Sequence, residues 1–228
     1  MNPVGHGLIG VPDAGAFLAR LIRLDPAALV RLRRLADPPR TALWALLPWQ
    51  VLVTRTVRGS GPEEATVAAA DLLAVLTAGR DRLPARRDAD WRWALPVSPG
   101  HVVETITTGE LVDIARAAAG TLRTAVTAHR VGERMVRDAL LDHVAIVVTA
   151  PQDAGPESPG AGRVEVPQRL VQAVVRMGFL GAREGYGDEP VQVRIAGRWV
   201  GLAAPYGTAW LRPVNEFSVR PVVTHTNG

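Results

Sequence analysis

The sequence contains no cysteine, and it also lacks lysine, so all 26 of its basic residues are arginine. Without cysteine the chain can form no disulfide, no thiol nucleophile and no iron–sulfur ligation. Without lysine it can form no Schiff base, cannot anchor pyridoxal phosphate and has no phosphate-binding lysine for a Walker motif. These two absences exclude several classes of enzyme, and we expect no cofactor.

Tyrosine is scarce as well, which changes the meaning of the high isoelectric point of about 10.7. With two tyrosines and a net charge of only +4, almost nothing titrates between neutral pH and the arginines, so a small excess of arginine raises the isoelectric point steeply. Residues 1–60 hold eight arginines and three aspartates, a charge of +5, and the rest of the chain carries −1. We therefore expect weak, salt-sensitive and sequence-indifferent nucleic-acid binding at most.

Long hydrophobic runs are missing too. The longest candidate, residues 42–53, is interrupted by Pro48 and Gln50, and a membrane span needs about 18 apolar residues. The first residues have neither the positive charge nor the apolar stretch of a signal peptide. These features predict a cytoplasmic protein that does not enter a membrane. The abundance of Arg, Ala, Val, Gly and Pro without lysine is typical of a bacterium with a high-GC genome.

Two segments show a clear helical period. Thr107 and Glu110 have the spacing of a capping box, and the apolar residues that follow recur at three- and four-residue steps, which predicts a helix over 108–129. A second helix is predicted over 167–177, and 143–149 has the pattern of a buried strand. The side chains that we expect in the core are Leu111, Ile114, Leu122, Ile146, Val148, Val171, Val174 and Val175.

The remaining pattern favours strands. Residues 191–195 and 199–203 alternate around Ala196-Gly197-Arg198, a hairpin signal. Further strands are predicted over 41–47, 50–57, 91–95, 102–106, 208–211 and 217–223, and helices over 13–23 and 63–77. For 28–35 both structures stay open: Asp25-Pro26 is typical of a helix start, whereas the alternation fits a strand. The sequence thus predicts an α+β fold with mostly antiparallel strands and amphipathic helices on one face.

Residues 79–90 are charged and irregular, which favours a domain boundary there. We predict a basic α/β subdomain over 1–80 and an α+β domain over 91–228 with a loop at 151–162; a single domain is the alternative. The apolar spacing of the helix over 13–23 matches that of the helix over 167–177, and predicted strands follow each. This similarity fits either an old duplication or the shared appearance of amphipathic helices before hairpins.

Motifs for catalysis are weak. Residues 5–10 match the letters GxGxxG, but a dinucleotide site needs a strand before the glycines; we expect a flexible glycine-rich segment instead. The five histidines lack metal-ligand spacing, so no metal is predicted. Asp142-His143 fits a histidine at a helix–strand corner better than a general base. A deep pocket containing His143 or Glu104 would instead indicate an enzyme.

Arginine and aromatic residues alternate near the C-terminus, and such side chains can bind acidic ligands, bases or a protein partner. The candidate binding residues are Arg198, Trp199, Tyr206, Trp210 and Arg212. The leading hypothesis is a non-catalytic protein that binds a ligand, another protein or a second copy of itself. An enzyme of unrecognised class remains an alternative. A weak nucleic-acid-binding regulator is another, but only one helix precedes the wing-like hairpin, where a winged helix has two.

Overall fold

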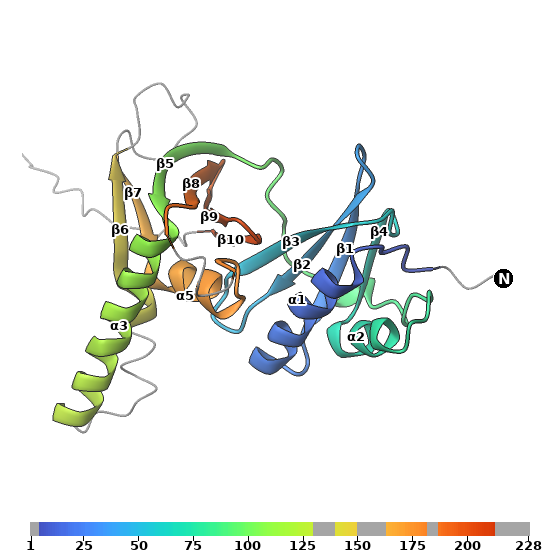
Figure 1. The fold of residues 1–228 in the computed structure, drawn as a ribbon, viewed down its shortest axis with the longest axis horizontal. Helices are drawn as coiled ribbons and strands as arrows, with labels where there is room; N and C mark the ends of the chain where they lie inside the picture. Colours follow the sequence, from blue (N-terminus) through green and yellow to red (C-terminus); the bar gives the residue numbers. More distant parts are fainter. Residues whose placement is uncertain (1–4, 130–139, 150–162, 182–186, 213–228) are drawn as a thin grey trace, which may run out of the picture.

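The computed structural model describes residues 5–129, 140–149, 163–181 and 187–212 (Figure 1). The helices are α1 (Val11–Leu24), α2 (Ala69–Thr77), α3 (Thr108–His129) and α5 (Gln168–Arg176), with a 3-10 turn at Asp88–Asp90. The strands are β1 (Leu29–Leu35), β2 (Arg40–Leu46), β3 (Leu52–Arg58), β4 (Glu64–Ala68), β5 (His101–Thr107), β6 (Val144–Thr149), β7 (Arg163–Pro167), β8 (Pro190–Ala196), β9 (Trp199–Ala204) and β10 (Gly207–Leu211). None of the described helices is long and apolar enough to cross a membrane.

Eight of the strands form one sheet in the order β4-β1-β2-β3-β10-β9-β8-β5. Every neighbouring pair in it is antiparallel. Strands β6 and β7 form a separate antiparallel pair. The prediction of an α+β fold with a mostly antiparallel sheet is therefore confirmed.

The sheet consists of two similar halves. Counted from either edge inward, the first half runs β4, β1, β2, β3 and the second runs β5, β8, β9, β10. The halves meet where β3 pairs with β10, and Val53 lies opposite Ala209 at this seam. Helix α1 precedes β1–β3 and α5 precedes β8–β10, while β4 leads directly into α2 and β5 directly into α3. The similarity between the two helices thus extends to the order of the strands that follow them.

Helices α1, α2, α3 and α5 cover the same face of the sheet (Figure 1). Helices α1 and α2 pack against each other beneath the first half, and α3 and α5 do so beneath the second. Fully buried side chains of both helix pairs, among them Leu18, Leu72, Leu111 and Leu170, belong to one continuous core with the inward-facing strand residues. Burial of this shared apolar surface is the main force that joins the halves.

The opposite face carries a smaller apolar cluster. Leu52, Trp91, Ala196 and Trp210 are buried there, and Trp199 is among the half-buried residues packed against them. Residue 91 belongs to the irregular segment after the 3-10 turn, which lies over the strands. The strand predicted over 91–95 is therefore wrong: these residues cover the sheet and do not pair within it.

Several other sequence predictions can be compared with the described residues. Residues 29–35 are a strand, which resolves the open alternative. The helix predicted over 63–77 is wrong in its first part, because Ala65 and Val67 point into the core from β4, which pairs with β1. Of the predicted core, Leu111, Val148, Val171 and Val174 are buried. Ile114, Ile146 and Val175 are half-buried against the same core. The side chain of Leu122 and residues 217–223 lie outside the described part.

The expectation of a flexible segment is wrong for residues 5–10. The backbone N–H groups of Ile9 and Gly10 both donate to the carbonyl oxygen of Arg58, at 2.9 and 3.0 Å. The ring of His6 is buried and its Nε2 lies 3.0 Å from the carbonyl oxygen of Arg80. The glycines allow this close packing, since a Cβ on Gly7 would lie 2.3 Å from the carbonyl oxygen of Ser60.

Candidate functional site

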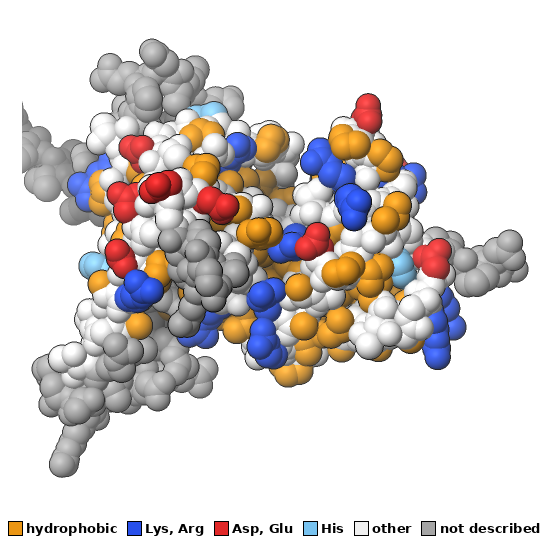
Figure 2. Space-filling model, viewed as in Figure 1, with side chains coloured by type: hydrophobic (Ala, Val, Ile, Leu, Met, Phe, Trp, Pro, Cys, Tyr) orange, Lys and Arg blue, Asp and Glu red, His pale blue; other side chains and the backbone are white. Residues whose placement is uncertain are grey.

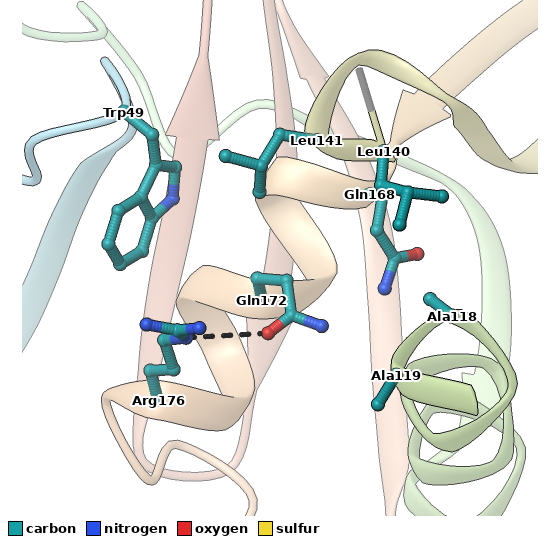
Figure 3. A pocket seen from close by; sticks show the side chains of 8 residues that line it. All are labelled: Trp49, Ala118, Ala119, Leu140, Leu141, Gln168, Gln172 and Arg176. Carbon is teal, nitrogen blue, oxygen red and sulfur yellow. Dashed lines mark hydrogen bonds between the residues drawn. The ribbon is translucent and has the colours of Figure 1, made fainter. Parts of the chain in front are cut away.

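A groove of about 120 Å³ lies over helix α5 (Figure 3). Gln168, Gln172 and Arg176 of α5 form its floor, Trp49 stands on one side, and Ala118 and Ala119 of α3 stand on the other. Leu140 and Leu141 close one end. Most of the lining surface is apolar. Its volume is close to the roughly 150 Å³ of a cavity that holds a benzene ring.

The floor of the groove follows from the pattern of α5. Leu170, Val171, Ala173 and Val174 are buried in the core. The three lining residues of α5 recur every fourth position, and this spacing aligns them along one stripe of the helix. The helix is fixed at its start, where the backbone N–H of Gln168 donates to the carbonyl oxygen of His143 at 2.8 Å.

Trp49 is held in place by the first turn of α5. Its Nε1–H donates to the carbonyl oxygen of Arg169 at 3.2 Å, and the Arg169 guanidinium donates to the carbonyl oxygen of Trp49 at 3.2 Å. Arg169 also pairs with Asp142. The tight turn between β2 and β3 places Gln50 at φ 64°, a left-handed conformation that is uncommon for residues other than glycine. This wall is therefore well constrained.

The polar groups in the groove are two amides, one guanidinium and one indole. Gln168 is 3% exposed, and its Nε2 is buried without a hydrogen-bond partner among the described residues. The Nε of Arg176 donates to Oε1 of Gln172 at 3.4 Å, and its guanidinium lies 5.5 Å from the centre of the Trp49 ring. Of the described residues that line the groove, none is acidic and none is a histidine. The groove thus suits a ligand that has an apolar body and oxygen acceptors.

The residues predicted as a binding site lie along the β9–β10 pair and in the turns beside it. Trp199 is half-buried and Trp210 is 3% exposed, and both belong to the apolar cluster on the helix-free face. Tyr206 is 47% exposed in the turn between β9 and β10, where the Arg55 guanidinium lies 5.5 Å from its ring. Arg198 and Arg212 are exposed, before β9 and after β10 respectively. The structure brings the two tryptophans together in one cluster, with Arg198 and Arg212 at the same end of the β9–β10 pair as Trp199, and Tyr206 at the other end.

The groove residues were missed by sequence reasoning, which concentrated on aromatic and arginine clusters. One signal was available, because Gln168, Gln172 and Arg176 form a polar stripe on a helix whose other residues, apart from Arg169, are apolar. The position of Trp49 could not be found in this way, since it lies 120 residues from its hydrogen-bond partner Arg169. His143 and Glu104 are both exposed and line none of the described pockets. The described residues hold no group of side chains suited to a metal ion.

Comparison with known families shows that the chain belongs to the family described as domain of unknown function DUF8185, which matches residues 95–216. Residues 10–94 match a second one, domain of unknown function DUF8010. The two matches meet just after the segment 79–90; the DUF8010 match contains β1–β4 and the DUF8185 match contains β5–β10. The division into domains 1–80 and 91–228 stays a prediction. No curated protein matches the chain.

The fold is similar to that of solved bacterial sliding clamps. The H. pylori β clamp in complex with diflunisal superposes with a TM-score of 0.52 at 11% identity over 94% of this chain and 66% of that one. The DNA polymerase III subunit beta of Pseudomonas aeruginosa gives 0.51 at 14% identity, covering 90% and 63%. A putative DNA polymerase III beta subunit from Eubacterium rectale gives 0.50 at 9% identity, covering 91% and 64%. The chain therefore spans less than two thirds of each of these proteins, and the likeness concerns the fold alone.

Proposed function

We propose that this member of the DUF8185 family is a non-catalytic protein that binds a partner protein, and that the groove over α5 is its binding site. The observation that carries the proposal is the amide of Gln168, which is buried in the groove without a hydrogen-bond partner among the described residues. A buried donor left unpaired costs about 1–3 kcal/mol. A bound acceptor would remove that penalty, so the groove favours an occupied state.

The lining of the groove supports binding and not catalysis. Its polar groups are two amides, one guanidinium and one indole, and none of these is an ordinary nucleophile or a general base near neutral pH. The exposed positions of His143 and Glu104 give the enzyme alternative no support from a pocket. A concave, mostly apolar site with a few convergent polar groups is the usual form of a ligand site.

A protein is the partner class favoured by the fold. The solved structures with this fold are named as subunits of a DNA polymerase, which assembles from several chains. By analogy, this chain binds either another protein or a second copy of itself. A shared fold supports a protein-binding role only by analogy, and the specific argument for that role comes from the groove over α5.

The charge distribution favours protein over nucleic acid. Figure 2 shows arginine and acidic side chains interspersed with apolar ones on the face drawn. Many described arginines form ion pairs, such as Arg31 with Glu64 and Arg55 with Asp13. A nucleic-acid interface usually presents a continuous basic patch.

Site-specific photocrosslinking in cells of the source organism tests the proposal. A benzophenone amino acid replaces Ala119 in the groove or, as the control, Val97, which is 96% exposed and lies outside it. We expect a discrete adduct from position 119 that is absent from position 97 and is lost when Gln168→Leu is added. An adduct of twice 24.4 kDa identifies a second copy as the partner, and a different mass identifies another protein. Equal adducts from both positions, or none from position 119, would overturn the proposal.

A further inference from the structure

We infer that the groove over α5 holds an extended peptide segment whose main-chain carbonyl groups accept hydrogen bonds from the glutamines of α5. This inference rests on the proposed function and names the chemistry of the bound partner. It depends on the spacing of the polar groups along the floor, on the shape of the walls and on a comparison between the halves of the chain.

The spacing of the floor matches an extended chain. Gln168, Gln172 and Arg176 lie at successive fourth positions of α5, so they recur about every 6 Å at a rise of about 1.5 Å per residue. In an extended strand, equivalent groups recur every second residue, about 6.6 Å apart. The three side chains therefore meet alternate residues of a segment of about five residues, and a segment lying along the helix keeps this register over the length of the groove.

The polar groups define what each part of the segment must offer. The Nε2 of Gln168 donates at the buried end, where a main-chain carbonyl can accept without bringing a charge into the apolar site. The Oε1 of Gln172 accepts from Arg176, which leaves the Nε2 of Gln172 to donate. Arg176 is exposed at the open end and lies against Trp49. A carboxylate there gains a charge-assisted hydrogen bond.

The walls define the side chains. Ala118 and Ala119 are small, so the α3 side leaves room for the apolar side chains of a ligand, and Leu140 and Leu141 add apolar surface at the buried end (Figure 3). The volume of about 120 Å³ accommodates a side chain of leucine or valine size, because a cavity of roughly 150 Å³ holds a benzene ring. The preferred segment thus has small or aliphatic residues followed by an acidic residue.

The first half of the chain provides an internal comparison. When α1 is aligned on α5 so that Phe17 corresponds to Leu170, the positions of Gln168, Gln172 and Arg176 are occupied by Gly15, Ala19 and Arg23. A Cβ on Gly15 would lie 3.9 Å from Leu73 of α2, so in this half the neighbouring helix occupies the space next to the helix. The same scaffold therefore carries a closed helix pair in one half and an amide-lined groove in the other, which indicates that the glutamines are not required by the fold.

Binding of a defined peptide to the full chain tests the inference. The probe is a fluorescein-labelled hexapeptide of sequence Gly-Val-Ala-Leu-Ala-Asp, and fluorescence anisotropy gives its Kd. We expect the Kd to rise about tenfold with Gln168→Leu and with Gln172→Leu, because each change leaves a peptide carbonyl unpaired. Arg176→Gln should weaken the aspartate peptide but not its asparagine analogue. Arg23→Gln, at the corresponding position of α1, is the matched control and should leave both affinities unchanged.

Three results would overturn the inference. The first is equal affinity of wild-type protein and Gln168→Leu for the hexapeptide. The second is equal affinity for the hexapeptide and for N-acetyl-leucine amide, which would mean that the groove holds one side chain and no extended segment. The third is the expected adduct from position 119 together with no peptide binding. In that case the groove binds a folded surface, and the proposed function stands while this inference fails.

Discussion

Truncation of two stacked phenylalanines should show whether the halves of the chain fold as one unit. Phe17 of α1 and Phe179, which follows α5, lie with parallel rings and centroids 6.4 Å apart, and both are at most 1% exposed. Phe179 also packs on β10, because a Cβ on Gly207 would lie 2.5 Å from its ring. The pair therefore links the two helix layers near the seam between β3 and β10.

The magnitude follows from burial and stacking. Phe17→Ala and Phe179→Ala should each lower the free energy of unfolding by about 3–5 kcal/mol. For a chain of 228 residues, each kcal/mol lowers Tm by about 2–4 °C. The double variant should be less destabilised than the sum of the single ones by about 0.5–1.5 kcal/mol, because the first truncation already removes the stacking.

Urea denaturation followed by far-UV circular dichroism measures all four proteins, and Phe→Leu variants replace any alanine variant that does not fold. We expect a single cooperative transition in each protein. A coupling energy below about 0.3 kcal/mol would mean that the rings are independent. Two separate transitions in the wild type would mean that the halves fold separately, and either result refutes the reasoning.

Three further predictions use other parts of the molecule. Gly201→Ala should destabilise the protein by about 1–3 kcal/mol and change its near-UV circular dichroism, because the new Cβ would lie 2.5 Å from the Trp210 ring. In the control variant Gly120→Ala the new Cβ meets nothing within 4 Å, so this change should stabilise the helix by up to about 1 kcal/mol. Burial raises the pKa of Asp88, but hydrogen bonds from the Arg86 side chain and the Thr66 backbone outweigh this, so the net pKa lies below its ordinary value. Such a carboxylate contributes stability above its unfolded pKa of about 4, and this stability is lost as the pH falls through the lowered folded pKa. Between pH 6 and pH 2.5 the Tm of Asp88→Asn should therefore fall less steeply than the Tm of the wild type. Parallel curves for the two proteins would contradict this. DNA binding measured by anisotropy should be weak and abolished by salt; nanomolar affinity for one duplex at physiological salt, as in specific complexes, would favour a regulator instead.

Features set by local chemistry could be predicted from the sequence. The capping box that begins α3 is present: the backbone N–H of Glu110 donates to Oγ1 of Thr107 at 3.1 Å, and the backbone N–H of Thr107 donates to Oε2 of Glu110 at 2.7 Å. The hairpin around Gly197 is present as well, since β8 and β9 pair on either side of it. In both cases the deciding contacts lie within a few residues of each other.

Features set by distant pairing could not be predicted. Glu64–Ala68 looked like the first turn of a helix, yet it is a strand because Val67 lies opposite Val30 of β1. Local propensity is a weak signal, and tertiary contacts override it. The join between β3 and β10 is of the same kind, because no local signal shows which strand will continue a sheet from the other half of the chain.

The predicted binding residues and the residues of the groove differ for a related reason. Trp199 and Trp210 were predicted as binding residues because large aromatic side chains are frequent in binding surfaces. A sheet whose second face is covered uses the same side chains to exclude water. In this structure both tryptophans belong to an apolar cluster with Trp91. Aromatic residues therefore do not distinguish a site from a core. A buried polar side chain without a partner calls for an explanation; Trp44 Nε1, Thr54 Oγ1 and Gln168 Nε2 are such groups among the described residues. Of these, Gln168 lines the groove that we propose as the binding site.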